Sequence, residues 1–247
     1  MIGPIESMLQ KNIEKHRCIH LALFDPEKSG KNLRTACASL EKLGTTAIMV
    51  GGSTVSSTQE LDANIKTIKD SCSLPAILFP NGLSGISRFA DAIFFMSLLN
   101  SSQTHYITGA QALGAPVVKR FKLETIPLGY ILVGESSTAV SSISRAELIP
   151  YSKPELAASY ALAAQYLGMR FVYLEAGSGA ERPVGTEMVR KVSSELEIPL
   201  IVGGGIRTPE HAQALAGAGA SAIVTGTILE QEGTRQVGRI VAALGRA

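Results

Sequence analysis

The chain lacks the features that define several large classes of protein. No stretch of it approaches the roughly 20 consecutive apolar residues that a membrane-spanning helix needs. Its net charge of +2 comes from interspersed acidic and basic residues and not from a basic block, so neither a nucleic acid nor an anionic membrane surface is indicated as a partner. The first 18 residues carry several charges and contain no signal-peptide core, and we therefore expect a cytoplasmic protein.

The chain is also poor in residues that form disulfides or hold soft metals. Cys18, Cys37 and Cys72 are odd in number and lack metal-site spacing, so we expect buried, reduced thiols. The four histidines share no spacing, and neither a zinc motif nor a nucleophile–base pair is present. The full G-x-G-x-x-G fingerprint is missing as well, which excludes dinucleotide binding.

What the chain does have is a regular alternation of apolar runs and helical segments over 247 residues, of which 45% are hydrophobic. Continuous apolar runs are typical of parallel strands that are buried on both faces. The length and the number of units favour an α/β fold, a closed (β/α)8 TIM barrel that forms one domain over residues 1–247. The eight predicted strands are Ile19–Phe24, Thr46–Val50, Ala76–Phe79, Ala92–Met96, Ile126–Val133, Phe171–Leu174, Leu200–Val202 and Ala222–Thr225.

Helical period predicts seven covering helices, and two connections depart from the pattern. Pro80–Asp91 has little room for a full helix, so part of the barrel flank is expected to be exposed there. Glu135–Ser152 is long enough to be a lid over the mouth of the barrel, or a solvated loop. The predicted helices are Lys31–Leu43, Gln59–Cys72, Gln103–Leu113, Lys153–Leu167, Val184–Leu196, Pro209–Gly217 and Thr234–Leu244.

Two small-residue turns near the end of the chain suggest a phosphate site. The strand that ends at Val202 runs into three glycines, and Thr208 then caps a helix with Pro209 in its first turn. About one strand–helix unit later, Thr225-Gly226-Thr227 repeats the arrangement. Exposed amides at such turns bind anions, so we predict that neighbouring strand ends hold one phosphate; the alternative is that the glycines only make tight turns.

A second candidate site lies at the end of the first two strands. Asp25 ends the first strand, and the segment 51–54, which includes Ser53, ends the second. A carboxylate beside a hydroxyl can bind Mg²⁺ if substrate phosphates and water complete its coordination. Asp25 could equally be a turn residue before a proline.

The sixth strand ends at Glu175, inside Tyr173-Leu174-Glu175-Ala176-Gly177-Ser178-Gly179. A carboxylate at the mouth of a barrel can take a proton from a substrate hydroxyl, and we predict a general base; a structural salt bridge is the alternative. Tyr173 is expected to point inward and is the second catalytic candidate. Ser178 and the loop amides could add hydrogen bonds to the phosphate.

Taken together, these segments resemble the geranylgeranylglyceryl phosphate synthases, Mg²⁺-dependent prenyltransferases of archaeal ether-lipid synthesis. The likeness covers nearly the whole chain, and the combination of its motifs is specific to that family. It is carried by residues 24–28 (FDPEK), 50–53 (VGGS), 126–130 (IPLGY), 173–179 (YLEAGSG), 202–207 (VGGGIR) and 225–227 (TGT).

The resemblance implies a reaction and a set of site residues. Geranylgeranyl diphosphate would alkylate the C3 hydroxyl of sn-glycerol 1-phosphate and release diphosphate. Mg²⁺ is the implied cofactor, with Asp25 and Ser53 as its ligands. The implied glycerol 1-phosphate site consists of Tyr173, Leu174, Glu175, Ala176, Gly177, Ser178, Gly179, Gly204, Gly205, Gly226 and Thr227.

The resemblance also implies an apolar groove for the prenyl tail where Pro80–Asp91 replaces a helix, with Phe95, Leu99 and Tyr106 as candidates for its far end. Bacterial relatives transfer a longer heptaprenyl chain, so donor length stays open, as do the contacts of Lys28 and Arg207 with a phosphate. The family forms dimers or hexamers, and product release could involve transient membrane contact. A phosphosugar isomerase or lyase and a non-catalytic phosphate-binding protein remain alternatives.

Overall fold

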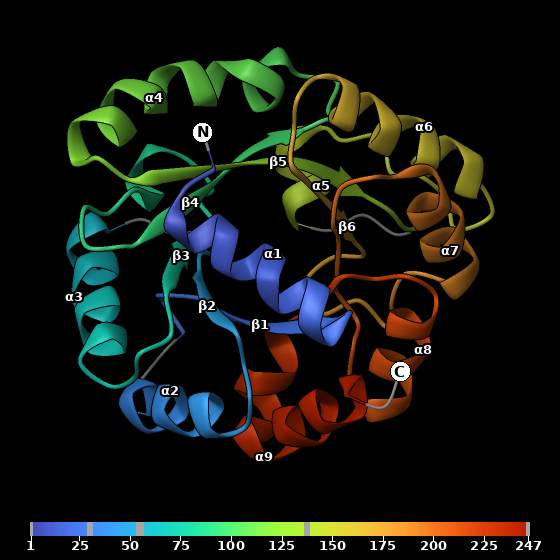
Figure 1. Ribbon diagram of the computed structural model, residues 1–247. Coiled ribbons are helices and arrows are strands. Elements are labelled where there is room, and N and C mark those ends of the chain that lie inside the picture. The colour runs from blue at the N-terminus through green and yellow to red at the C-terminus, as the bar shows by residue number, and fades with distance from the viewer. Residues whose placement is uncertain (1, 29–31, 53–56, 136–138, 246–247) are drawn as a thin grey trace.

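Eight parallel strands close into a barrel in the computed structural model, which describes residues 2–28, 32–52, 57–135 and 139–245 (Figure 1). The strands pair in sequence order, and β1 closes the barrel against β8. Each lies within two residues of its predicted bounds, so the predicted fold class is confirmed. The strands are β1 Ile19–Phe24, β2 Ala47–Val50, β3 Ala76–Leu78, β4 Ala92–Leu98, β5 Glu124–Leu132, β6 Phe171–Glu175, β7 Leu200–Gly203 and β8 Ala222–Thr225.

Helices form an outer ring around the barrel (Figure 1). Within the described ranges, no helix is both long enough and apolar enough to cross a lipid bilayer. The helices are α1 Pro4–His16, α2 Leu33–Lys42, α3 Thr58–Lys69, η1 Leu83–Gly85, η2 His105–Gly109, α4 Ala110–Phe121, α5 Ala139–Ser144, α6 Pro154–Tyr166, α7 Thr186–Glu195, α8 Pro209–Gly217 and α9 Thr227–Leu244.

The strands are apolar throughout because both of their faces are buried. Side chains such as Leu21 and Met49 fill the barrel interior, whereas their neighbours Ala22 and Ile48 pack against the helices. Alternate residues therefore serve two separate cores, as expected for a parallel sheet covered by helices.

The two unusual connections have different structures. Between β3 and β4 the chain forms only the single turn η1, a 3₁₀ helix, so the prediction that this connection has no full helix is confirmed. The connection after β5 contains α5, and Ile149 then returns to pair with Val133 beside the barrel. Since α5 contributes side chains to the wall of the main cavity, this connection is not merely a solvated loop.

Two helices differ from their predicted ranges. The helix predicted at Gln103–Leu113 begins as the π-helix η2 and continues as α4 to Phe121, past Pro116. A proline normally ends a helix, but Pro116 lies on the exposed face, where water can satisfy the carbonyl left without its N–H partner. Helix α9 is broken at Gly233, with φ at 73°, and only its second part was predicted.

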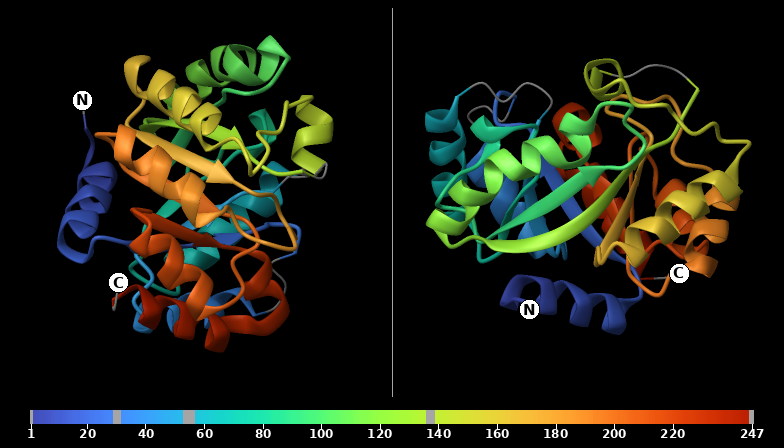
Figure 2. Two further views of the ribbon diagram at one scale, coloured as in Figure 1. Left: turned by 90° about the vertical axis from the view of Figure 1, so that its right-hand side faces the viewer. Right: turned by 90° about the horizontal axis from the view of Figure 1, so that it is seen from above.

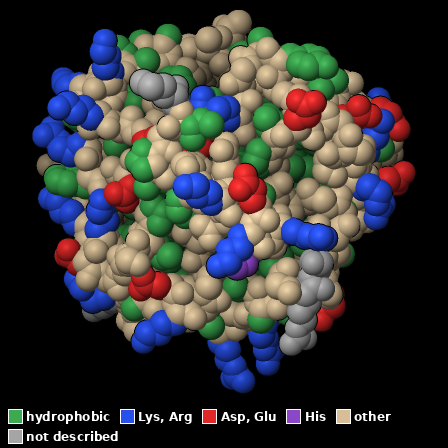
Figure 3. Space-filling model, in the orientation of Figure 1, with side chains coloured by type: hydrophobic (Ala, Val, Ile, Leu, Met, Phe, Trp, Pro, Cys, Tyr) green, Lys and Arg blue, Asp and Glu red, His purple; other side chains and the backbone are tan. Residues whose placement is uncertain are grey.

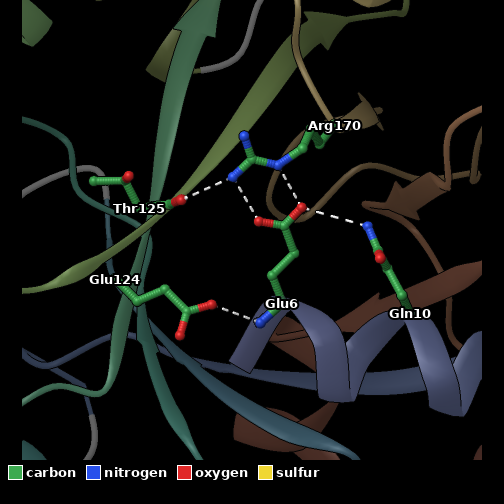
Figure 4. Close-up of polar contacts among 5 residues, drawn as sticks. All are labelled: Glu6, Gln10, Glu124, Thr125 and Arg170. Carbon is green, nitrogen blue, oxygen red and sulfur yellow. Dashed lines mark hydrogen bonds and ion pairs between the residues drawn. The ribbon is translucent and has the colours of Figure 1, made fainter. Parts of the chain in front are cut away.

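Helix α1, which was not predicted, lies across the N-terminal end of the barrel (Figures 1 and 4). Its first turn has no side-chain cap of its own, and the Glu124 carboxylate instead accepts the amides of Ile5 and Glu6 at 2.8 and 2.7 Å. Arg170 Nη2 donates to the fully buried Glu6 carboxylate at 2.6 Å and also to the carbonyl of Thr125 at 3.2 Å.

The carboxyl ends of the parallel strands, and the loops that follow them, lie at the end of the barrel opposite α1. Figure 2 shows α1 and α5 at opposite ends of the barrel. On the face that carries α1, Lys and Arg side chains are scattered with Asp and Glu among them, and they form no continuous basic field (Figure 3). This face therefore shows the interspersed acidic and basic residues, without a basic block, that the sequence predicts.

Candidate active site

A cavity of about 410 Å³ opens at the carboxyl ends of the strands. Every strand or the turn that follows it contributes to its lining, so the cavity lies where barrel enzymes place their reactive groups. The cavity brings together most of the predicted site residues, namely Asp25, Tyr173, Glu175, Gly177, Ser178, Gly179, Gly204, Gly205, Gly226 and Thr227.

Three predicted residues stand apart from this group. The side chains of Leu174 and Ala176 do not line the cavity and pack instead in the outer core, because alternate residues of β6 point to opposite faces. The Ala176 amide donates to the carbonyl of Gly203 at 3.0 Å and so joins the ends of β6 and β7. Ser53, the second predicted metal ligand, lies outside the described residues.

The glycine-rich end of the cavity is built from the three loops that follow β6, β7 and β8. Gly204 and Gly205 have φ values of 82° and 68°. A Cβ on Gly204 would lie 2.5 Å from Glu175 Oε1, and one on Gly205 would lie 2.5 Å from the carbonyl oxygen of Arg182, so only glycine fits at either position. Across the gap, Ser178 Oγ lies 3.4 Å from Thr227 Oγ1, at the start of α9.

Glu175 ends β6 and is 8% exposed. Burial raises its pKa, and hydrogen bonds from the Tyr173 hydroxyl and from the amide of Gly177, which donates to Oε1 at 2.6 Å, partly offset that effect. Glu175 forms no ion pair within the part of the chain that the structure describes, so the salt-bridge alternative finds no partner there. A buried carboxyl with a raised pKa is suited to accept a proton near neutral pH.

Three aromatic rings line the cavity beside Glu175. The centroids of Phe79, Tyr130 and Tyr173 lie 5.3 to 5.6 Å apart. Burial and the negative charge of Glu175 raise the pKa of Tyr173, so its hydroxyl stays protonated. That hydroxyl is buried beside the Glu175 carboxyl group, and a Cβ on Gly203 would lie 2.1 Å from its oxygen. Sequence reasoning assigned no site role to Phe79 or Tyr130, although Tyr130 lies in one of the family segments.

Asp25 follows the last residue of β1, lines the cavity and is 8% exposed. Its Oδ1 accepts the amide of Glu27 at 3.1 Å, so it also forms the turn that the alternative interpretation expected. A Cβ on Gly52 would lie 2.6 Å from the Asp25 carboxyl carbon, which shows how closely the end of β2 approaches.

The donor set around Asp25 suits one kind of metal site. No group of three His, Cys, Asp or Glu residues that could enclose a metal ion occurs in the described ranges. Such a site could not hold a metal by protein ligands alone. It fits Mg²⁺, which commonly binds one or two carboxylates and takes its other ligands from water and substrate phosphates.

The cavity extends from this polar region into an apolar arm. The arm passes between η1, β4, the η2–α4 segment and α5, where the Pro80–Asp91 connection leaves the flank uncovered by a full helix. Of the candidates for its far end, Phe95 and Tyr106 line the cavity, but Leu99 does not and packs in the outer core. The apolar lining includes Leu83, Ile86, Phe95, Met96, Tyr106, Val118, Val140 and Ile143.

Comparison with known proteins agrees with this geometry. A model of the PcrB family matches residues 11–244. The chain is 54% identical over 230 residues to geranylgeranylglyceryl phosphate synthase from Pyrococcus abyssi, covering 93% of this chain and 91% of the relative. It is 50% identical over 246 residues to the enzyme of that name from Thermofilum pendens, covering 98% and 96%.

Solved structures give the same result. The crystal structure of (S)-3-O-geranylgeranylglyceryl phosphate synthase from Thermoplasma acidophilum, in complex with sn-glycerol-1-phosphate, matches with a TM-score of 0.92 at 43% identity over all of both chains. The corresponding enzyme from Thermoplasma volcanium matches with a TM-score of 0.91 at 40% identity over 97% of this chain and 98% of that one. The chain belongs to the PcrB family.

Proposed function

We propose that this protein is a geranylgeranylglyceryl phosphate synthase, which transfers the prenyl group of geranylgeranyl diphosphate to the C3 hydroxyl of sn-glycerol 1-phosphate. The observation that carries the proposal is that one cavity is lined by the glycine turns after β7 and β8, by the carboxyl groups of Glu175 and Asp25, and by an apolar arm. The names of the relatives and the glycerol phosphate bound in the Thermoplasma acidophilum structure support it.

The glycerol 1-phosphate binds through its phosphate to backbone amides. Gly204 and Gly205 leave the backbone bare at the end of β7, and Gly226 and Thr227 present the start of α9. The first turn of a helix has unpaired N–H groups and a partial positive charge, which favour a phosphate. Ser178 adds a hydroxyl from the loop after β6.

Glu175 acts on the other end of the same substrate. Glu175 lines the cavity and its Oε1 accepts the amide of Gly177, so the loop after β6 also fixes the base. The C3 oxygen attacks C1 of the prenyl group, the bond from C1 to the diphosphate breaks, and the hydroxyl proton passes to Glu175. Tyr173 and its aromatic neighbours keep water away from this bond.

Asp25, together with Ser53, would hold Mg²⁺ beside the diphosphate. When bound, the ion neutralises the negative charge that develops on the leaving group. The backbone at Gly52 packs against the Asp25 carboxylate and fixes its direction.

The apolar arm binds the prenyl tail. Burial of apolar surface is worth about 25 cal/mol per Å², so a long tail can supply much of the affinity for the donor. An isomerase or lyase of small phosphosugars would leave this arm without a use. We carry over from the resemblance a dimer or hexamer and a cytoplasmic location with transient membrane contact.

The test is turnover with donors of increasing length. Purified protein is incubated with radiolabelled sn-glycerol 1-phosphate, Mg²⁺ and geranyl, farnesyl, geranylgeranyl or heptaprenyl diphosphate, and the label is then extracted into organic solvent. We expect extraction to be greatest with geranylgeranyl diphosphate. A preference for the heptaprenyl donor would reassign the chain length, and label that stays in water with every donor would refute the prenyltransferase.

A further inference from the structure

Two basic side chains line the cavity in the described part of the chain, and they have different partners. Arg207 Nη2 donates to the carbonyls of Gly179 and Ala180 at 3.4 and 3.2 Å. Arg207 therefore belongs to the loop that holds the glycerol phosphate. Lys28 lies on the side of Asp25, where the prenyl diphosphate would bind.

Lys28 joins two carboxylates from opposite ends of the chain. Its Nζ lies 3.4 Å from Asp25 Oδ2 and 3.8 Å from Glu230 Oε2, and all three residues line the cavity. Glu230 lies in the first part of α9, just beyond the anion-binding turn. The ammonium thus balances two negative charges at the place where a divalent cation and a diphosphate would have to enter.

The Lys28 ion pairs are weak enough to be exchanged. The Lys28 side chain is 56% exposed, and neither distance is that of a short hydrogen bond. Exposed pairs of this kind contribute little because water and salt screen them. A lysine is also a compact charge on a long flexible stem, so it can change partners without movement of the backbone.

We infer that Lys28 exchanges partners during the binding of substrate. It pairs with Asp25 and Glu230 before the substrates bind, and it contacts the diphosphate of the prenyl donor once a divalent cation has taken its place at Asp25. This inference rests on the proposed function. Lys28 would then bind the leaving group. One divalent cation does not neutralise a diphosphate together with the two carboxylates of Asp25 and Glu230, and the Lys28 ammonium supplies a further positive charge.

The exchange predicts opposite effects of one substitution on two affinities. In Lys28→Gln, Mg²⁺ alone should bind about two- to fivefold tighter by calorimetry, because its competitor at Asp25 is gone. Inorganic diphosphate in saturating Mg²⁺ should bind about 10- to 100-fold more weakly, since a charge-assisted hydrogen bond is lost. The affinity for sn-glycerol 1-phosphate should stay within about twofold.

Lys11→Gln is the matched control, because Lys11 is exposed on α1 at the other end of the barrel and should change neither affinity. If Lys28→Gln weakens Mg²⁺ and diphosphate together, Lys28 only maintains the site and the exchange is refuted. Diphosphate affinity within threefold of the parent refutes it as well. Either of these results refutes only the exchange if the unmodified protein still makes prenylated product. If the unmodified protein has no turnover, the proposed function itself is overturned.

Discussion

Replacement of Glu175 by glutamine removes the general base but keeps the hydrogen bond that this side chain accepts in the folded protein. The amide oxygen of glutamine can still accept the N–H of Gly177, which donates to Glu175 Oε1 at 2.6 Å, so the loop after β6 should keep its shape. Only the ability to take up a proton is lost. A positioned general base contributes roughly 10²–10⁴-fold to a rate. We therefore expect kcat to fall by about that factor, which corresponds to about 3–5 kcal/mol of barrier.

The assay is the transfer of labelled glycerol phosphate into the organic phase, and the control is the affinity of the variant for sn-glycerol 1-phosphate by calorimetry. We expect that affinity to stay within about threefold of the parent. A kcat within a few-fold of the parent would refute the general base, and a matching loss of affinity and rate would mean that the carboxylate mainly binds substrate.

The raised pKa of Glu175 adds two consequences that depend on pH. Only the ionised carboxylate accepts the proton, so kcat of the parent should rise with pH through a midpoint above the ordinary carboxyl value, and the variant should lose that limb. A raised pKa also means that the folded protein binds this proton more tightly than the unfolded chain. The parent's stability should therefore fall as pH rises from the unfolded pKa to the folded one. Above that window Glu175→Gln should melt at a higher temperature than the parent, by differential scanning calorimetry, and a lower melting temperature there would contradict this account.

Three further substitutions test the other parts of the cavity. Asp25→Asn should abolish Mg²⁺-dependent turnover and leave glycerol phosphate binding by calorimetry intact; equal loss of both would contradict the division of the site. Gly114→Leu fills the apolar arm, where even a Cβ would meet Ile86 Cδ1 at 3.3 Å, so product analysis should show a shift to shorter donors, whereas Ala115→Leu on the exposed face of α4 should show none. Gly204→Ala forces an L-residue to a φ of 82° beside Glu175 and should destabilise the protein by about 1–3 kcal/mol in chemical denaturation; unchanged stability and activity would show that the glycine is not needed there.

The barrel could be predicted because its signals are local. Each strand is a short apolar run, and the turns at Gly204 and Thr208 follow from residues that lie next to one another in the sequence. Helix α1 was not predicted because its docking depends on Glu6 meeting Arg170, which lies 164 positions away. The continuation of α4 past Pro116 was missed because a local rule about proline takes no account of which face is exposed.

In the candidate site, too, the residues with a local signal could be predicted, and the contacts between residues far apart in the sequence could not. Asp25 and Glu175 were found because each ends a strand, and strand ends meet at one mouth. The alternation of β6 predicts that Leu174 points away from the mouth, and it entered the expected site only through its place in a family segment. The contact of Lys28 with Glu230 could not be predicted, since 202 positions separate the two and nothing local joins them.

The most direct measurement is a crystal structure of the protein with sn-glycerol 1-phosphate, Mg²⁺ and an unreactive thiodiphosphate analogue of the prenyl donor. The account predicts the glycerol phosphate on the amides of Gly204, Gly205 and Thr227, its C3 hydroxyl within hydrogen-bond distance of Glu175, and the diphosphate beside Asp25. A diphosphate bound away from Asp25, or a C3 hydroxyl out of reach of Glu175, would contradict it.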